Sequence, residues 1–417
     1  MANSTETTGG PRAASPEEFV SACRLFIGFA SALGNPIPVP SGAESQHLAN
    51  SPILLGGGDC AHEVAGGKGD TFEQSIASCV GEGLERYFLS GVYRSPGMVE
   101  THATLVIRHL DAIDPVADVG FPLVNSEAVA YTPELPIEWT PAADAATGER
   151  SLVPTNLIFC PYVPAAGASI IVAGSTNGTA AGATISDATN QAMFEVIERD
   201  AFWYYARTGI SPVEVGRDDL PCEIVVEMDT SELRFCTMLL PNPFGIPVAQ
   251  VVASSVGGQA STARGTGAGV TAQHAIRRAY AECLQMYASL STGIGVEENE
   301  SDMRHLWHSG KSKHIWPHFF APSAETDSPQ TSTAPLVEFA TTDEARKHIL
   351  DVSAGHAIRW YVASVMSTDH FAIAKVLNTQ VSVVDSSYFK SNTRLRDFAR
   401  YMGHPERPIV YHGPLFM

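Results

Sequence analysis

Residues 175–201, which read STNGTAAGATISDATNQAMFEVIERDA, contain the most informative pattern in the sequence. The first part is a loop of small residues, and the rest predicts a long helix over about residues 186–206. Three polar residues of this helix stand at positions i, i+4 and i+7, which places them on one face. They are Gln191, Glu195 and Glu198, and Arg199 follows directly.

The same spacing recurs in two other predicted helices, one from Thr71 to about Ser90 and one over about residues 272–290. The matching residues are Ser78, Glu82 and Glu85, followed by Arg86, in the first helix, and Arg278, Glu282 and Gln285 in the other. The sequence Glu-x-x-Glu-Arg thus occurs twice in the chain. This recurrence favours a shared function for the three faces over ordinary surface ion pairs, which are the alternative.

The helices that carry the two Glu-x-x-Glu-Arg sequences have apolar or small residues on almost every side. Their carboxylates are therefore expected to be buried, and a buried carboxylate needs a cation or a hydrogen-bond partner. Hard oxygen ligands suit Mg²⁺, which nucleotide sites hold with one or two carboxylates and phosphate oxygens. The sequence therefore predicts a shared carboxylate–Mg²⁺ site.

A glycine-bearing loop is expected before each of these helices, at Gly66–Gly69, Gly174–Gly182 and Gly265–Gly269. Glycines permit a close approach of the backbone to a ligand, and helix N-termini attract phosphate. Lys68 adds a positive charge suited to phosphate. The chain has neither the GxxxxGK[ST] loop nor a GxGxxG sequence in a βαβ unit, so a nucleotide site of a common type is excluded.

The overall composition narrows the class of protein. The chain has 417 residues, of which 44% are hydrophobic, so it can bury a large core. Its net charge of −19 argues against nucleic-acid binding, which requires basic patches, and against docking on anionic membranes. The seven cysteines form no CxxC pair and fit reduced thiols. With no signal pattern and no apolar run of about 18 residues, we expect a soluble cytoplasmic protein.

The rest of the chain predicts a mixed α/β or α+β domain. We expect a disordered N-terminus over residues 1–16, a helical lead-in over 17–45 with a helix at 17–33, and a domain over 46–417 that contains a surface loop or insertion at 295–335. Extended runs are expected at 103–110, 151–159, 223–228, 246–254, 358–366 and 371–385. Capping boxes are expected where helices begin, at Thr71 and Thr341.

Three other features have ordinary interpretations. Cys79 lies beside Ser78 and is expected to pack in the core rather than act as a nucleophile. The histidines at 305, 308, 314 and 318 have no acidic or cysteine ligand in register, which disfavours zinc. The aromatic run Trp203–Tyr205 is expected to pack in the core or at the end of the helix rather than to stack on a nucleotide base.

These segments, in this order, resemble the YcaO family over roughly residues 45–390. The resemblance rests on the Gly66–Gly69 segment with its following helix, on Ser175–Ala201, and on the helix that carries Arg278, Glu282 and Gln285. It implies a YcaO-like fold in which ATP and Mg²⁺ lie among several long helices packed on mixed sheets. By this resemblance Glu82, Glu85, Glu195 and Glu198 are Mg²⁺ or ribose and phosphate contacts, and the nucleotide contacts or their supports are Lys68, Ser78, Arg86, Asn177, Gln191, Arg199, Arg278, Glu282 and Gln285.

The resemblance also implies transfer of the ATP γ-phosphoryl group to a carbonyl oxygen of a ribosomally made precursor peptide. Attack by a side-chain thiol or hydroxyl then gives an azoline, attack by an N-terminal amine gives a macrocyclic amidine, and attack by sulfide gives a thioamide. Residues 404–417 lack the Pro-x-Pro-x-Pro tail of many azoline-forming members, so all three outcomes stay open.

Residues 1–45 are too short for a peptide-binding domain, so a leader-binding partner protein or a stand-alone subtype is expected. Family resemblance further implies a homodimer. Two alternatives from other classes are a non-catalytic scaffold that binds peptide, and an ATP-dependent ligase acting on a carboxylic acid.

Overall fold

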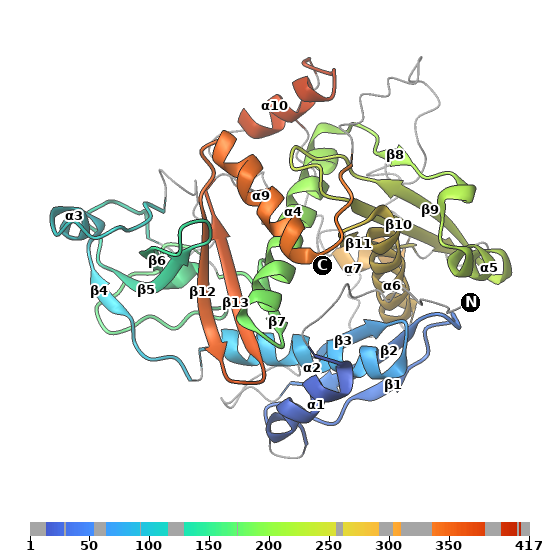
Figure 1. Ribbon diagram of the computed structural model, residues 1–417, viewed down its shortest axis with the longest axis horizontal. Coiled ribbons are helices and arrows are strands. Elements are labelled where there is room, and N and C mark those ends of the chain that lie inside the picture. The colour runs from blue at the N-terminus through green and yellow to red at the C-terminus, as the bar shows by residue number, and fades with distance from the viewer. Residues whose placement is uncertain are drawn as a thin grey trace.

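A computed structural model describes residues 14–28, 31–53, 64–91, 93–115, 129–172, 174–255, 262–291, 303–309, 336–379, 393–406 and 408–409. These residues form three sheets whose strand pairs are antiparallel, with long helices between them (Figure 1). The mixed α+β fold expected from the sequence is therefore confirmed. Within the described part of the chain, no helix is long and apolar enough to cross a membrane.

The strands divide by sheet as follows. The first sheet contains β1 (Ile37–Val39), β2 (His47–Pro52) and β3 (Val64–Gly69). The second has the order β11 (Thr262–Ala268), β10 (Val248–Ser255), β9 (Leu233–Leu239) and β8 (Val213–Glu214). The third has the order β4 (Met98–Glu100), β5 (Ile137–Asp144), β12 (Trp360–Ser367), β13 (Ala372–Asn378) and β7 (Thr179–Gly182), and β6 (Arg150–Pro154) pairs with β5.

The helices surround and separate these sheets. They are α1 (Pro16–Cys23), η1 (Arg24–Phe26), α2 (Phe72–Leu89), α3 (His102–Ile107), η2 (Thr155–Leu157), α4 (Ile185–Thr208), η3 (Arg217–Asp219), α5 (Cys222–Thr230), α6 (Ala272–Ser291), α7 (Met303–His308), α9 (Thr342–Gly355) and α10 (Thr393–Tyr401).

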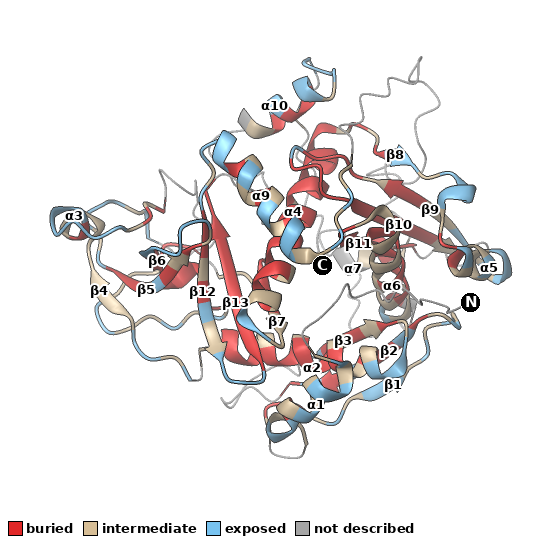
Figure 2. Cartoon of the chain, viewed as in Figure 1, coloured by how far each residue is buried: buried red, intermediate tan, exposed pale blue. Residues whose placement is uncertain are grey.

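Three strand–helix units position the polar faces. Strand β3 leads into α2, β7 into α4, and β11 into α6, and each helix packs on the sheet that contains its own strand. Helix α2 also contacts β7, and α4 also contacts β11, so the units meet at their inner sides. Figure 2 shows that α4 is buried along most of its length, whereas α9 and α10 present exposed faces.

Close approach between strand and helix explains the glycine-rich segments. A Cβ on Gly67 would lie 2.0 Å from the backbone oxygen of Ser75 in α2, and a Cβ on Gly265 would lie 2.2 Å from that of Ala279 in α6. Only glycine permits this spacing. The segments at Gly66–Gly69 and Gly265–Gly269, expected to be loops, are therefore mostly strand, because alternate glycines face a helix.

Several other predictions were wrong in detail. Residues 223–228 are part of helix α5 rather than a strand, with Ile224 buried on one face. Residues 103–110 mostly belong to helix α3, which Thr101 caps. At Thr71 the hydroxyl accepts the N–H of Gln74 as expected, but the Gln74 side chain accepts from Asp70 rather than from the cap.

The lead-in over 17–45 is helical only at its start. Helix α1 and η1 end at Phe26, and Gly28, with a φ of 120°, has a conformation that a helix cannot contain. Residues 1–13 lie outside the described part of the chain, and so does most of 295–335. The described residues 303–309 of that insertion form helix α7, in which Trp307 is buried rather than part of a surface loop.

Candidate active site

The three helices begin in the same way and carry their polar residues in the same register. The hydroxyls of Thr71, Thr184 and Thr271 each accept the N–H of the residue three positions on. Counted from these caps, position +7 is Ser78, Gln191 or Arg278, position +11 is Glu82, Glu195 or Glu282, and position +14 is Glu85, Glu198 or Gln285. Because the three helices converge and share this register, they bring their residues at the three positions into a common site.

On α2 the two carboxylates face the neighbouring strands. Glu82 accepts a hydrogen bond from the backbone N–H of Gly66 at 3.3 Å and pairs with Arg86 at 2.6 Å. Glu85 accepts the N–H of Ala181, on β7, at 2.6 Å. Helix α2 is therefore tied to β3 through one carboxylate and to β7 through the other.

On α4 the two carboxylates contact different elements. Glu195 accepts the N–H of Gly178 at 3.0 Å. Glu198, which is only 4% exposed, accepts the Thr266 hydroxyl at 2.6 Å and the Ala268 N–H at 3.1 Å, both from β11. One nitrogen of the Arg199 guanidinium lies 3.6 Å from Glu195, and the other lies 3.6 Å from Glu198.

Helix α6 completes the site from a third direction. Glu282 pairs with Lys68 of β3 at 2.7 Å. A Cβ on Gly66 would lie 2.2 Å from the Nε2 atom of Gln285, so this amide lies directly against β3. The structure thus brings the predicted residues of all three helices into one region, with Ser78 half-buried on α2 one turn before Glu82.

Burial and neighbouring charges shift the pKa values of these carboxyl groups. Burial, opposed by the hydrogen bond from Ala181 and increased by the charges of Glu195 and Glu82, raises the pKa of Glu85 well above its ordinary value. Burial also raises the pKa of Glu82 and that of Glu195. For Glu282 burial acts in the same direction, but Lys68 and Arg199 outweigh it and lower the pKa to about 2.

The residues present fit Mg²⁺ and a polyphosphate. Glu82, Glu85 and Glu195 supply partly buried carboxylate oxygens, and oxygen donors of this kind suit Mg²⁺. Lys68 and Arg199 provide positive charges beside them. The interpretation of these faces as ordinary solvated ion pairs does not fit this burial.

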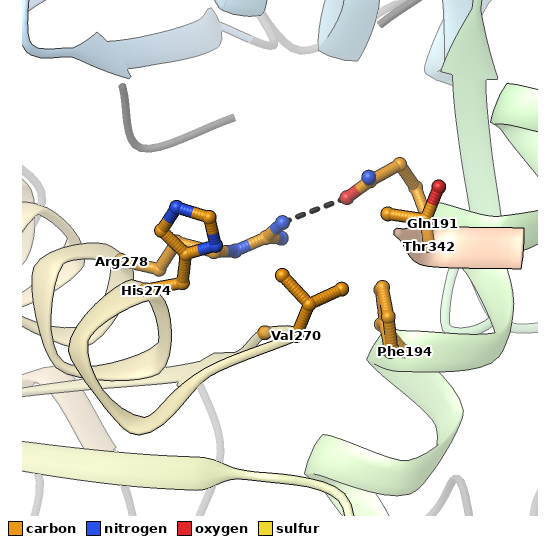
Figure 3. A pocket seen from close by; sticks show the side chains of 7 residues that line it. Gln191, Phe194, Val270, His274, Arg278 and Thr342 are labelled. Atoms are coloured by element: carbon orange, nitrogen blue, oxygen red, sulfur yellow. Dashed lines mark hydrogen bonds between the residues drawn. The ribbon is translucent and has the colours of Figure 1, made fainter. Parts of the chain in front are cut away.

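A small, open hollow lies between the N-terminal parts of α4 and α6 (Figure 3). Arg278 donates a hydrogen bond to Gln191 across it at 2.7 Å. Its lining residues are Gln191, Phe194, Gly269, Val270, His274, Arg278 and Thr342. The hollow therefore combines polar groups from two helices with an apolar wall.

Two residues of the site were missed by the sequence analysis. Thr266 was placed in a loop, although the period-two alternation of Gly265, Gly267 and Gly269 is typical of a strand and would have directed Thr266 to the other face. Lys375 is a single lysine in the apolar strand β13, and it donates to the carbonyl oxygens of Ser175 and Asn177. A lone charge in a buried strand is the signal that could have revealed it.

The ordinary interpretations of three further features can also be compared with the structure. Cys79 is fully buried, donates from Sγ to the Ala65 carbonyl, and has a pKa raised to about 12 by burial. Its assignment to the core is confirmed, as is that of Trp203–Tyr205. Among the described residues no three His, Cys, Asp or Glu side chains are close enough to hold a metal by themselves, so Mg²⁺ at the carboxylates would take its remaining ligands from phosphate oxygens and water. His314 and His318 lie outside the described residues.

The pH dependence of stability offers a test of the carboxylate cluster. Because the pKa of Glu85 is raised, the native state keeps its proton at pH values where the unfolded chain has lost it. The contribution of Glu85 to the free energy of unfolding therefore falls as the pH rises above 4.5, which is the ordinary pKa of a glutamate side chain. Glu85→Gln, whose amide oxygen can still accept from Ala181, should lack this fall, so in metal-free buffer it should gain stability relative to wild type as the pH rises.

Urea unfolding at a series of pH values from about 4.5 to about 7.5 measures this difference. Glu100→Gln, which changes a carboxylate outside the site, is the control. Parallel pH profiles for wild type and Glu85→Gln would show that the fold does not raise the pKa of Glu85.

Comparison with known proteins agrees with this arrangement. Residues 66–378 match the protein family described as YcaO cyclodehydratase, ATP- and Mg²⁺-binding. An uncharacterized protein of Methanothermobacter thermautotrophicus is 26% identical over 274 residues, which is 64% of this chain and 68% of that protein.

Two solved structures share the fold. A heterocyclase in complex with substrate and cofactor matches with a TM-score of 0.83 and 19% identity, over 100% of this chain and 59% of its own length. YcaO from Methanopyrus kandleri, bound with AMPPCP and Mg²⁺, matches with a TM-score of 0.66 and 19% identity, over 92% of this chain and 96% of its own. The family match covers most of the chain, and with it the three strand–helix units: this protein belongs to the YcaO family of ATP- and Mg²⁺-binding cyclodehydratases.

Proposed function

We propose that this protein phosphorylates a backbone amide oxygen of a ribosomally made precursor peptide, using ATP, and so enables a cyclodehydration to an azoline or a macrocyclic amidine. The observation that carries this proposal is the convergence of carboxylates from α2 and α4 with basic residues from β3, α4 and α6. Family membership and the heterocyclase fold support it.

Within this proposal Glu82, Glu85, Glu195 and Glu198 hold Mg²⁺. When bound, Mg²⁺ neutralises charge on phosphate oxygens during phosphoryl transfer. The residues proposed to contact the nucleotide or to support those contacts are Lys68, Ser78, Arg86, Asn177, Gln191, Arg199, Arg278, Glu282 and Gln285. Lys68 and Arg199 are each held by a carboxylate in the structure, so their charges have fixed positions when phosphate arrives.

The chemistry follows from the poor leaving-group character of an amide oxygen. The amide oxygen bonds to the γ-phosphorus as ADP leaves, and the amide N–H loses its proton. A thiol, hydroxyl or amine of the substrate then adds to the amide carbon and loses its own proton, and the C–O bond breaks as phosphate departs. The peptide thereby loses the atoms of one water. Binding of the nucleophile close to the amide carbon supplies most of the proximity effect, up to about 7–11 kcal/mol.

We place the acceptor amide at the hollow of Figure 3. Arg278 and Gln191 offer hydrogen bonds to a carbonyl, and Phe194 and Val270 offer an apolar surface. Arg278 and Gln191 also lie one helical turn from Glu282 and Glu195, so an amide here would adjoin the carboxylates.

The peptide sequence and the nucleophile are outside this assignment. A leader-binding partner protein and a homodimer remain predictions of the family resemblance, as does a cytoplasmic location.

The proposal is tested by mass spectrometry of a candidate precursor peptide encoded beside the gene, incubated with the protein and Mg²⁺ in the presence or absence of ATP. An ATP-dependent loss of the mass of one water supports it, and fragmentation distinguishes an azoline from an amidine. Exchange of one oxygen for sulfur in the presence of sulfide would instead indicate thioamide formation. If the peptide shows no mass change and no phosphate is released, even with a candidate partner protein present, the protein is a non-catalytic scaffold. Phosphate or AMP release with a carboxylic acid, independent of peptide, would indicate a ligase.

A further inference from the structure

Lys375 is the buried lysine of strand β13, and it is only 1% exposed. Its Nζ atom donates to the carbonyl oxygen of Ser175 at 2.6 Å and to that of Asn177 at 2.5 Å. No carboxylate among the described residues lies within ion-pair distance of it. A buried ammonium that donates to two backbone carbonyls of one loop acts on the geometry of that loop, because both carbonyls would otherwise lose their donor.

The backbone groups of Gly178, at the end of this loop, are bound by β13 and α4. The N–H of Val376 in β13 donates to the Gly178 carbonyl at 2.8 Å, and the N–H of Gly178 donates to Glu195 in α4 at 3.0 Å. The N–H of Asn177 donates to the Ser175 hydroxyl at 3.1 Å. Three carbonyls of the loop are thus turned toward β13, and the last N–H is turned toward α4.

The end of the loop has no freedom to adjust. Gly178 has a φ of 75°, in the left-handed region, and a Cβ there would lie 2.8 Å from the Val376 carbonyl oxygen. The loop is therefore closed against β13 at its end, and Lys375 holds the carbonyls of Ser175 and Asn177 before it.

Lys375 also connects the loop to the carboxylate cluster. Burial lowers the pKa of Lys375 to about 8, and the charge of Glu195, which accepts the Gly178 N–H, opposes this effect. The lysine and the glutamate therefore hold the loop from opposite sides, one through carbonyl oxygens and the other through an N–H.

We propose that Lys375 is a positioning residue for nucleotide binding, which fixes loop 175–178 through the carbonyls of Ser175 and Asn177 before the nucleotide arrives. The inference rests on the proposed function for the identity of the ligand, because Asn177 is one of the proposed nucleotide contacts. The fixing of the loop itself does not depend on that function. Lys375 touches neither the reacting atoms nor, in this proposal, the nucleotide.

The test uses the full chain with Lys375→Met, which keeps the length of the side chain and removes its donors, and Lys375→Gln, which keeps an uncharged donor. Lys347→Met, at an exposed lysine of α9, is the matched control. Hydrogen exchange of the nucleotide-free proteins should show the amides of residues 177–179 exchanging at least about tenfold faster in Lys375→Met. Calorimetry with AMPPCP and Mg²⁺ should show at least about tenfold weaker nucleotide binding by Lys375→Met than by wild type. The affinity of Lys375→Gln should lie between those of wild type and Lys375→Met, and that of Lys347→Met should be within about twofold of wild type.

The outcomes separate the inference from the proposed function. Unchanged exchange at residues 177–179, or nucleotide affinity within about twofold of wild type, would overturn the role of Lys375. If wild type itself does not bind AMPPCP with Mg²⁺, the proposed function fails, and the exchange measurement still decides whether Lys375 fixes the loop. Thermal melting verifies that each variant is folded. If Lys375→Met does not fold, Lys375→Gln decides, and faster exchange confined to this loop supports the inference.

Discussion

Replacement of Glu195 by glutamine should lower peptide-stimulated phosphate release by roughly 10³-fold, about 4 kcal/mol of transition-state stabilisation, while leaving the protein folded. The glutamine oxygen can still accept the N–H of Gly178, so the loop before α4 keeps its contact. What is lost is one negative charge among the carboxylates proposed to hold Mg²⁺. The measurement is a phosphate-release assay at saturating ATP over a range of Mg²⁺ concentrations.

Two comparisons make this expectation specific. Glu223→Gln, which removes a carboxylate paired with Arg277 outside the site, should retain near wild-type turnover. Glu195→Gln should also require more Mg²⁺ for half-maximal binding of AMPPCP, measured by calorimetry without peptide. If Glu195→Gln turned over within tenfold of wild type at low Mg²⁺, Glu195 would not be part of a metal site.

The second large effect is expected at Gly67, where replacement by alanine should destabilise the protein by at least about 3 kcal/mol. A Cβ at this position would lie 2.0 Å from the Ser75 oxygen and 2.4 Å from the Cys79 nitrogen, and both are backbone atoms of α2. Neither can rotate away, so β3 and α2 must separate. Because α2 also carries Glu82 and Glu85, nucleotide affinity should fall together with stability.

Gly81, in helix α2, provides the control. A Cβ on Gly81 would lie 3.7 Å from the Ala181 Cβ, which is an ordinary contact distance. Gly81→Ala should therefore be neutral or stabilise the protein by up to about 1 kcal/mol, because alanine is the better helix former. Urea unfolding of the two variants measures the difference. Equal stability of Gly67→Ala and wild type would show that the strand–helix spacing is not fixed by this glycine.

The helical faces were predictable because their signal is local. A spacing of i, i+4 and i+7 needs only the geometry of one helix, so the faces at Glu82, Glu195 and Glu282 could be identified in advance. The threonine caps at Thr71 and Thr341 were recognised for the same reason, since the hydroxyl and the N–H it binds are three residues apart.

Elements whose conformation depends on a neighbour were not predictable in this way. Residues 64–69 and 262–268 are strands because α2 and α6 pack on their glycines, and single-sequence preferences associate such glycines with loops. Residues 223–228 alternate like a strand but form α5, in which Ile224 supplies the single buried contact. In each case packing outweighs local propensity.

From the sequence alone we predicted the polar residues that the three helices bring together and the helical face that each one occupies, because these depend on residue type and on spacing along one element. The tertiary structure alone decided how the three helices meet. It paired Lys68 with Glu282 across more than two hundred residues, placed Thr266 against Glu198, and brought Lys375 beneath Ser175 and Asn177. Such contacts require distant segments to pack at one place, and no local pattern in the chain encodes that packing.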